Sequence, residues 1–497
     1  MHTKKDYIKI QRGLDIPLQG AAAESISDAR NIRTYALLPD DFVGVAPKLL
    51  VAQGDTVTAG TALFSDKNDP RILFPSPVNG VIRQIVRGEK RRLVAVVVER
   101  EDVPPATHSP LQHSSKLESP HLRERLLAEG LWPLLRQRPF GTVAHPDSQP
   151  KGIFISCFDT APLAPKLELL LKGREEAFLA GLQLLAHLAP APIHLSFGCE
   201  ESPIERTVRR HLVTPLSPFH IHHFSGPHPA GNVGTHIAYI DPINKGDVVW
   251  ILGPQEVAIL GHWALTGEYR PDRCVAFAGP AAKQPHYYRI TSGACVAQLV
   301  DQQRFNPLYP ALDDHPSVAA DSSIRYISGN VLSGTTLAPD GFVHFYDSLI
   351  TALAEGHYYD FMGWLLPGFR KYSFSRTFIS GMLQPLFTKL QPLFKSLLPL
   401  CEATPPLCDK LLFDTNRHGD VRPFVLTGQF ERLMPLDIYP LQLIKAAIIG
   451  DIDLMEQLGI YEVEPEDFAL CEFADASKTE IQTIIRTALE QCRKEAL

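Results

Sequence analysis

A proline-rich segment divides the sequence into two regions whose apolar residues follow different periods. Residues 103–119 contain Pro104, Pro105 and Pro110 among several Ser and His residues, a composition typical of a linker. Before this segment, short apolar runs are separated by glycine turns, which indicates strands. After it, amphipathic stretches alternate with short apolar runs, which favours a parallel α/β layer. The sequence therefore predicts a β domain at residues 1–103 and a Rossmann-like α/β domain at residues 104–260.

The first region repeats a strand–turn–strand unit. Val51, Val57 and Leu63 recur every six residues, with Gly54 and Gly60 at turn positions. The pattern VAQGDTVTAGTALF…SPVNGVI resembles a biotinyl/lipoyl-like barrel-sandwich hybrid. Such domains can carry biotin or lipoate on a hairpin lysine, and the candidate here is Lys67. Because Lys67 lies in a charged turn, out of register with the carrier motif, the sequence favours a scaffold over the alternative of a biotin/lipoyl-type carrier protein.

The α/β region lacks the motifs that bind dinucleotides or nucleotides. Its strand GIFIS runs into CFDTAP without a G-x-G-x-x-G pattern, which a pyrophosphate needs for close backbone approach. The glycine-rich stretch 224–236 is not followed by Gly-Lys-Ser/Thr, so a Walker-type loop is also unsupported. A second alternative, a dinucleotide-dependent dehydrogenase, therefore lacks its fingerprint.

The same stretch and the residues before it are rich in histidine. Its members are His220, His222, His223, His228 and His236. A metal site needs convergent ligands, and the glycines and prolines between these residues predict a loop that need not bring them together. The sequence therefore favours an interface or ligand cleft over a metal site, and no metal ligands are assigned.

The remaining residues predict two further domains of an α/β multidomain protein. Short strands return in RCVAFAGPAA, HYYRITSGACV and RYISGNVLSG, which indicates a small β-grasp domain at residues 261–335. Residues 336–497 are predicted to form a helical C-terminal domain. In its last segment Ile481, Ile485 and Leu489 recur at helical spacing, so residues 478–497 are predicted to form an amphipathic helix.

Composition and charge exclude several classes of protein. The formal net charge is −7 with no dense Lys/Arg block, so nucleic acid is not an expected partner. No apolar segment follows the N-terminal lysines, which predicts a cytosolic chain. The most apolar stretch, 177–193, is interrupted by two prolines and is marginal in length for a span, so no transmembrane segment is expected. The eight cysteines contain no C-x-x-C pair, so no iron–sulfur cluster is expected.

Several long strings occur in order over nearly the whole chain. They are IKIQRGLDIPLQG, FSGPHPAGNVGTHIAYIDPI, KYSFSRTFIS, FDTNRHGD and ERLMPLDIYPLQLIKAAIIGDIDLMEQLGIYEVEPEDFALCEF. Together they resemble the family of A subunits of bacterial sodium-translocating NADH:quinone oxidoreductases (Na+-NQR). The resemblance implies membership in a six-subunit translocase that oxidises NADH, reduces a quinone such as ubiquinone and exports sodium ions. It also implies a peripheral position on the cytoplasmic face of the bacterial inner membrane.

The resemblance further implies that this chain holds no flavin or iron–sulfur cluster, which other subunits supply. The family is similar to the C subunit of Rnf complexes and the flavoprotein subunit of complex I, where a Rossmann-like layer precedes a soluble-ligand-binding β-grasp (SLBB-like) domain. The family often has a second cysteine shortly after the one matched by Cys471, and Asp475 takes that place here. No catalytic acid, base or nucleophile can be assigned from the spacing of residues.

Two segments are candidates for contacts with quinone or partners. The resemblance to a quinone reductase and the turn chemistry of Gly226, Pro227, His228, Pro229 and Gly231 predict a quinone-facing or partner-facing surface, with a purely internal turn as the open alternative. Residues 382–400 depart from the family pattern. Prolines recur there every seven residues among Leu and Phe, which predicts short helical turns that pack on a membrane subunit or lipid headgroups, or else fold back as core.

Overall fold

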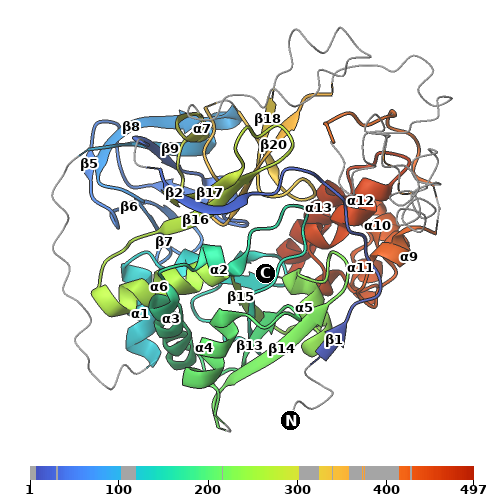
Figure 1. Ribbon diagram of the computed structural model, residues 1–497, viewed down its shortest axis with the longest axis horizontal. Helices are drawn as coiled ribbons and strands as arrows, with labels where there is room; N and C mark the ends of the chain where they lie inside the picture. The colour runs from blue at the N-terminus through green and yellow to red at the C-terminus, as the bar shows by residue number, and fades with distance from the viewer. Residues whose placement is uncertain are drawn as a thin grey trace, which may run out of the picture.

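The computed structural model describes residues 7–29, 32–101, 119–214, 216–300, 324–338, 340–356, 372, 374, 413–425 and 428–496. The segment 382–400 lies outside these residues. Two β domains, an α/β layer and a cluster of C-terminal helices are joined in one molecule (Figure 1).

The first domain consists of two sheets that pack face to face. Its strands are β3 (Thr34–Leu37), β9 (Leu93–Arg100), β8 (Gly80–Arg87) and β5 (Thr56–Val57) in one sheet, and β4 (Pro47–Leu49), β6 (Ala62–Asp66) and β7 (Leu73–Pro75) in the other. Gly54 and Gly60 take φ values of +93° and +94° at the turns that flank β5, as their spacing predicted. The Phe64 and Phe74 rings stack in the core with centres 4.6 Å apart.

The α/β layer is a seven-stranded sheet in the order β1-β14-β13-β12-β15-β10-β11. The strands are β1 (Tyr7–Lys9), β14 (Phe219–Ser225), β13 (Ile193–Phe197), β12 (Ile153–Ser156), β15 (Val249–Leu252), β10 (Arg136–Arg138) and β11 (Thr142–Val143). The first five are parallel. The chain passes outward from β12 to β14 and then returns to β15 on the other side of β12, so the sheet has a topological switch point between β12 and β15.

Helices cover both faces of this sheet. Those on one face are α1 (Ser119–Ala128), α3 (Glu175–Leu188), α4 (Pro203–Leu212) and α6 (Pro254–Thr266), while α5 (Val233–Ile240) packs on the other face against Phe154 and Ile251. Helices α3 and α6 lie in contact through Gly181 and Gly261, where an added Cβ would overlap the backbone of the opposite helix. The stretch 177–193 thus forms most of α3 and the approach to β13. No helix among the described residues is long and apolar enough to cross a membrane.

A six-stranded mixed sheet follows, in the order β19-β18-β20-β16-β17-β2. Its strands are β19 (Thr335–Leu337), β18 (Ile324–Ser328), β20 (Leu349–Ala354), β16 (Asp272–Ala278), β17 (His286–Thr291) and β2 (Ala23–Asp28). The predicted boundary at residue 335 was wrong, because β20 belongs to this sheet. All six residues of β20 are buried, so the strand lacks the alternation that would distinguish it from a buried helix.

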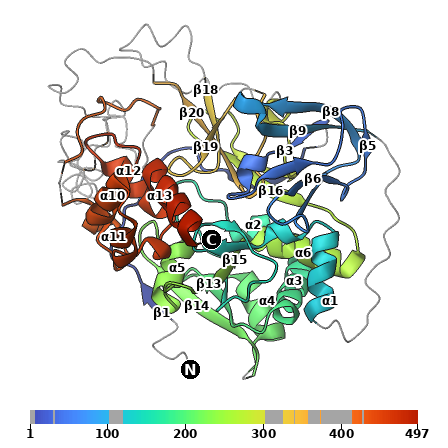
Figure 2. The same ribbon diagram turned by 180° about the vertical axis from the view of Figure 1, so that it is seen from behind.

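The C-terminal domain is built from short helices around its own core. They are α9 (Phe430–Leu433), α10 (Pro440–Ile449), α11 (Ile452–Gln457), η4 (Ile460–Glu462), η5 (Pro465–Phe468), α12 (Ala469–Ala474) and α13 (Ile481–Ala496). The predicted amphipathic helix is confirmed as α13, with Ile481, Ile485 and Leu489 at most 1% exposed. Figure 2 shows these helices beside α5.

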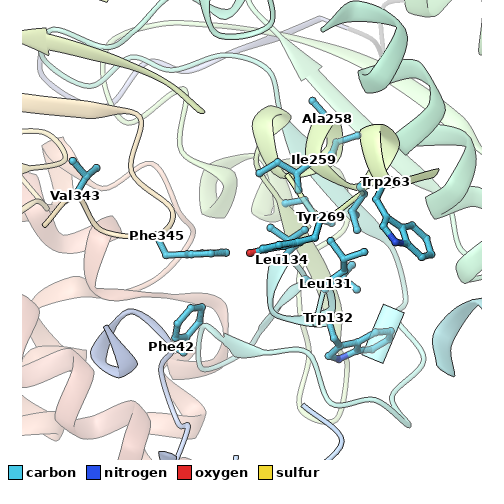
Figure 3. Packing of buried hydrophobic residues seen from close by; sticks show 14 of the residues in the cluster. Phe42, Leu131, Trp132, Leu134, Ala258, Ile259, Trp263, Tyr269, Val343 and Phe345 are labelled. Atoms are coloured by element: carbon cyan, nitrogen blue, oxygen red, sulfur yellow. The ribbon is translucent and has the colours of Figure 1, made fainter. Parts of the chain in front are cut away.

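Buried contacts join the parts of the molecule. The Arg138 guanidinium is 1% exposed and forms ion pairs across to the C-terminal domain with Glu466 (2.5 Å) and Asp467 (3.2 Å). Phe42 of the first domain packs against Phe345, which lies between β19 and β20 of the six-stranded sheet, with ring centres 5.1 Å apart. Both belong to an apolar cluster that includes Trp132 and Trp263 (Figure 3). Apolar packing and buried ion pairs therefore join the domains.

Candidate functional site

The carboxyl ends of β12 and β14 form the edge of the sheet where α/β proteins bind ligands. Two loops begin there, one at Cys157 and one at Gly226. The segment that follows β1 runs across the same edge, where the Ile10 N–H donates to the Ser225 carbonyl (2.7 Å) and the Leu14 N–H donates to the His228 carbonyl (2.8 Å). Residues far apart in sequence thus meet at one edge.

The predicted quinone-facing or partner-facing loop, residues 226–231, is largely buried at this edge of the sheet. Gly226 is exposed and Pro227 is half-buried, whereas His228, Pro229 and Gly231 are buried. Gly226 has φ +133°, and a Cβ there would overlap the Ile10 carbonyl. Gly231 lies against the backbone of Asp159 and Thr160 in the same way. The two glycines are therefore required by close packing of the loop against the other two segments.

Polar contacts connect this loop to the other two segments. The Thr160 hydroxyl oxygen accepts a hydrogen bond from the Gly231 N–H (2.9 Å) and lies 3.2 Å from His228 Nδ1. The His228 N–H donates to an oxygen of Asp15 (2.9 Å). Burial lowers the pKa of His228 to about 4, so the imidazole is neutral at pH 7.

A cavity of about 310 Å³ opens beside these contacts. Its lining is mostly apolar and comprises Asp15, Ile16, Pro17, Leu18, Ala21, Thr160, Ala161, Pro162, Leu163 and Ala164. Asp15 and Thr160 are its polar side chains, and both contact His228 or its backbone. An apolar pocket with a few convergent polar groups is the usual form of a small-molecule site.

Sequence reasoning singled out the loop 226–231, none of whose residues lines the cavity, and missed Asp15 and Thr160. Thr160 had a signal, since it follows a buried strand in CFDTAP, where ligand-binding loops begin. Asp15 gave no comparable signal, because its proximity arises only when β1 pairs with β14.

The switch point between β12 and β15 is not shaped for a pyrophosphate. Gly253 precedes α6, and the space where its Cβ would point is taken by the Glu256 carboxylate. Glu256 is 4% exposed and forms an ion pair with the buried Arg273. A helix N-terminus attracts anions, but here a carboxylate of the chain already lies against it.

The hairpin lysine of the first domain lies in an anchored turn. Lys67 is exposed, but its N–H donates to the Ala46 carbonyl (2.8 Å). A few residues later, Arg71 forms an ion pair with Asp147 of the α/β layer (2.7 Å). This contact ties the hairpin to a neighbouring domain, whereas a carrier lysine must swing between active sites.

The histidines of the predicted loop lie in different elements. His220, His222 and His223 belong to β14, so the loop prediction was wrong for these three residues; His228 lies in the loop and His236 in α5. His223 faces Glu205 of α4 (3.1 Å). Within the part of the chain that the structure describes, no three His, Cys, Asp or Glu side chains are arranged as ready metal ligands.

Comparisons with known proteins match most of the chain. A model described as the NqrA N-terminal barrel-sandwich hybrid domain matches residues 8–101, which confirms the fold predicted for the first domain. A model described as the NqrA second alpha/beta domain matches residues 117–269. Among solved structures, an NAD+-reducing [NiFe]-hydrogenase covers 42% of this chain and 41% of its own at 12% identity, with a TM-score of 0.30, a likeness too low to support an argument.

Curated relatives match over their full length. The chain is 36% identical to the A subunit of the Na(+)-translocating NADH-quinone reductase of Yersinia pseudotuberculosis, over 98% of this chain and 100% of the relative. It is 34% identical to proteins of the same name from Rhodopirellula baltica and Haemophilus influenzae, over 100% and 98% of this chain and 100% of each relative.

Proposed function

Because the chain belongs to the family of A subunits of Na(+)-translocating NADH-quinone reductases, we propose that it serves as the A subunit of such a complex. The complex oxidises NADH, reduces a quinone and moves sodium ions, as the names of the relatives state. The observation that carries this proposal is the match along the full length of both chains. The partners of the chain are the other five subunits of the proposed six-subunit complex. In this assignment the chain lies peripherally on the cytoplasmic face of the inner membrane.

We also propose that the chain contributes no redox group of its own. Support comes from the scattered cysteines, from the absent dinucleotide fingerprint and from the Glu256 carboxylate at the start of α6. In this assignment the α/β layer is a Rossmann-like domain that has lost its nucleotide, and the six-stranded sheet is an SLBB-like β-grasp domain. Stoichiometric flavin absorbance in the purified chain would contradict this assignment.

Within the complex, the cavity beside Thr160 is the proposed place for a quinone ring. Thr160 Oγ1 accepts from the Gly231 N–H and, when His228 carries its proton on Nδ1, from His228 as well. Both lone pairs of the hydroxyl are then occupied, and its own hydrogen remains to donate to a quinone carbonyl. The apolar lining from Ile16 to Leu18 suits the ring and its substituents.

The test is Thr160→Val in the assembled complex, which removes the hydroxyl and keeps the shape of the side chain. Loss of one hydrogen bond of about 0.5–1.5 kcal/mol predicts a KM for quinone raised roughly 2- to 12-fold. NADH oxidation with a soluble artificial acceptor should not change. Thr487→Val, on the exposed side of α13, is the matched control. An unchanged KM for quinone in Thr160→Val would refute the quinone site but leave the family membership of the chain intact.

A further inference from the structure

Three large aliphatic side chains face solvent where α10 ends and α11 begins. Ile448 is 52% exposed, Ile449 is 72% exposed and Leu454 is 37% exposed, all within the stretch 448–454. We call these three residues the α10–α11 corner. Both helices lie on the side of the C-terminal domain that faces away from the first domain (Figure 2). Single exposed aliphatic residues are common on protein surfaces, whereas a group of them marks a surface that another molecule covers.

The end of α10 does not itself need these isoleucines. β-branched residues lose side-chain freedom in a helix, and the last turn of a helix favours cations, yet α10 has no basic residue there. The Gly450 N–H donates to the Ala447 carbonyl (3.3 Å). The Asp451 N–H donates to the Ala446 carbonyl (3.1 Å), and these two bonds close the helix without either isoleucine. The helix fills the core of its domain with other residues, the buried Leu441, Leu443, Ile444 and Ala446.

Negative charge surrounds the corner. The carbonyl end of α10 carries the partial negative charge of the helix dipole, and the exposed Asp451 and Asp453 follow it directly. Lys445 is an exposed cation one turn earlier on α10, while Lys245 is already paired with Glu456 (2.6 Å). The corner therefore suits an apolar segment that carries its own cations, and it is poorly suited to anionic lipid headgroups.

We propose that the α10–α11 corner docks a segment of a membrane subunit of the complex, in which aliphatic side chains are flanked by Lys and Arg. This inference rests on the proposed function of the chain as the A subunit. Cytoplasmic loops of membrane proteins carry an excess of Lys and Arg beside their apolar spans, which is the chemistry that the corner complements. Asp451 stays in place as the cap of α11, where its Oδ1 accepts from the Leu454 N–H (3.0 Å). Asp453 is then the carboxylate available to a cation of the partner.

The test uses the complex with an affinity tag on a membrane subunit and measures how much of this chain stays bound as KCl is raised. The double change Ile448→Ser and Ile449→Ser should weaken retention by at least about tenfold, because two aliphatic side chains no longer leave water on docking. Asp453→Asn should weaken retention less and make it less sensitive to salt. Leu265→Ser is the matched control and should be retained like the wild type. Leu265 is 41% exposed and, like Ile448, lies two residues before a left-handed glycine that ends its helix.

The outcomes separate this docking site from the proposed function. Equal retention of the double variant and the wild type would refute the docking site and leave the assembly intact. A wild-type chain that does not stay with the complex would refute the proposed function and the docking site together. The urea midpoint of the isolated double variant should match that of Leu265→Ser, and a lower midpoint would mean that the corner packs within the chain itself. Binding of the isolated chain to anionic phospholipid vesicles that is lost in the double variant would assign the corner to lipid and overturn the proposal.

Discussion

His344 lies at the junction between the first domain and the six-stranded sheet, where its Nδ1 is 2.6 Å from an Asp41 oxygen. The other Asp41 oxygen accepts from the Phe345 N–H (2.8 Å). Burial by itself would lower the pKa of His344, but Asp41, with Asp347 and Asp40 nearby, raises it above its ordinary value. The pair therefore joins the two domains most strongly when the imidazole is protonated.

This pair predicts a pH dependence of stability. Its contribution is complete below the unfolded pKa of about 6.5 and is lost as the pH rises through the higher folded pKa. We expect Asp41→Asn, which keeps an acceptor for the Phe345 N–H, to remove this part of the dependence. The measurement is the urea midpoint of the wild type and the variant at pH 6 and pH 8. The same decrease between these pH values in both proteins would contradict the assignment.

At the level of single residues, sequence reasoning identified conformation better than environment. The glycines at positions 226 and 231 were taken as turn positions; Gly226 has a positive φ of +133°, whereas Gly231 is required by its close contact with Thr160. Sequence reasoning could not show that His228 is buried, because the segments that cover this side chain come from residues 10–16 and 157–162. Long-range contacts of this kind leave no local pattern.

Among the elements, the contact between α3 and α6 depends on glycine. We expect Gly261→Ala to be destabilising although alanine favours helices. Overlap with the Ala177 carbonyl should cost near the upper end of about 1–3 kcal/mol. This outweighs the roughly 1 kcal/mol that alanine gains over glycine in a helix. The net loss should be about 1–2 kcal/mol of unfolding free energy.

Denaturant unfolding followed by circular dichroism measures this loss. Gly419→Ala is the control, because Gly419 is exposed, has no positive φ and would place its Cβ in ordinary van der Waals contact with the Lys478 side chain, 3.8 Å away. A Gly261→Ala protein as stable as the control would show that the two helices can separate without cost.

Elements with a clear period were predictable, and elements defined by their neighbours were not. The apolar residues of α13 recur at helical spacing in the sequence because one face of the helix is buried and the other is exposed to solvent. β20 is buried on both faces, and β1 and β2 are three and six residues long with largely exposed side chains. Such strands are specified by the partners they pair with, so their assignment needs the tertiary structure.

For the whole molecule, Arg138 links the α/β layer to the C-terminal domain. Arg138→Leu leaves Asp467 buried without its counter-charge, which should cost about 3–5 kcal/mol. The C-terminal domain should then open from α5, seen as faster hydrogen exchange in η5 and α13. Arg83→Leu is the control, since Arg83 is 74% exposed in its pair with Glu99 and should change stability by less than about 0.5 kcal/mol. Exchange as slow as in the wild type would show that the remaining contacts, among them the Lys245–Glu456 ion pair, hold this domain without Arg138.

The placement of β1 and β2 bears on how the chain is made by the ribosome. β1 completes its pairing with β14, and β2 with β17, yet these partners are more than two hundred residues later in the sequence. At translation rates of about 5–20 residues per second, β1 waits on the order of 10–40 seconds for its partner to emerge. During that time both strands expose unpaired backbone groups, which are sites for chaperones or for mispairing. Neither the α/β sheet nor the six-stranded sheet can be completed during synthesis of the first half of the protein.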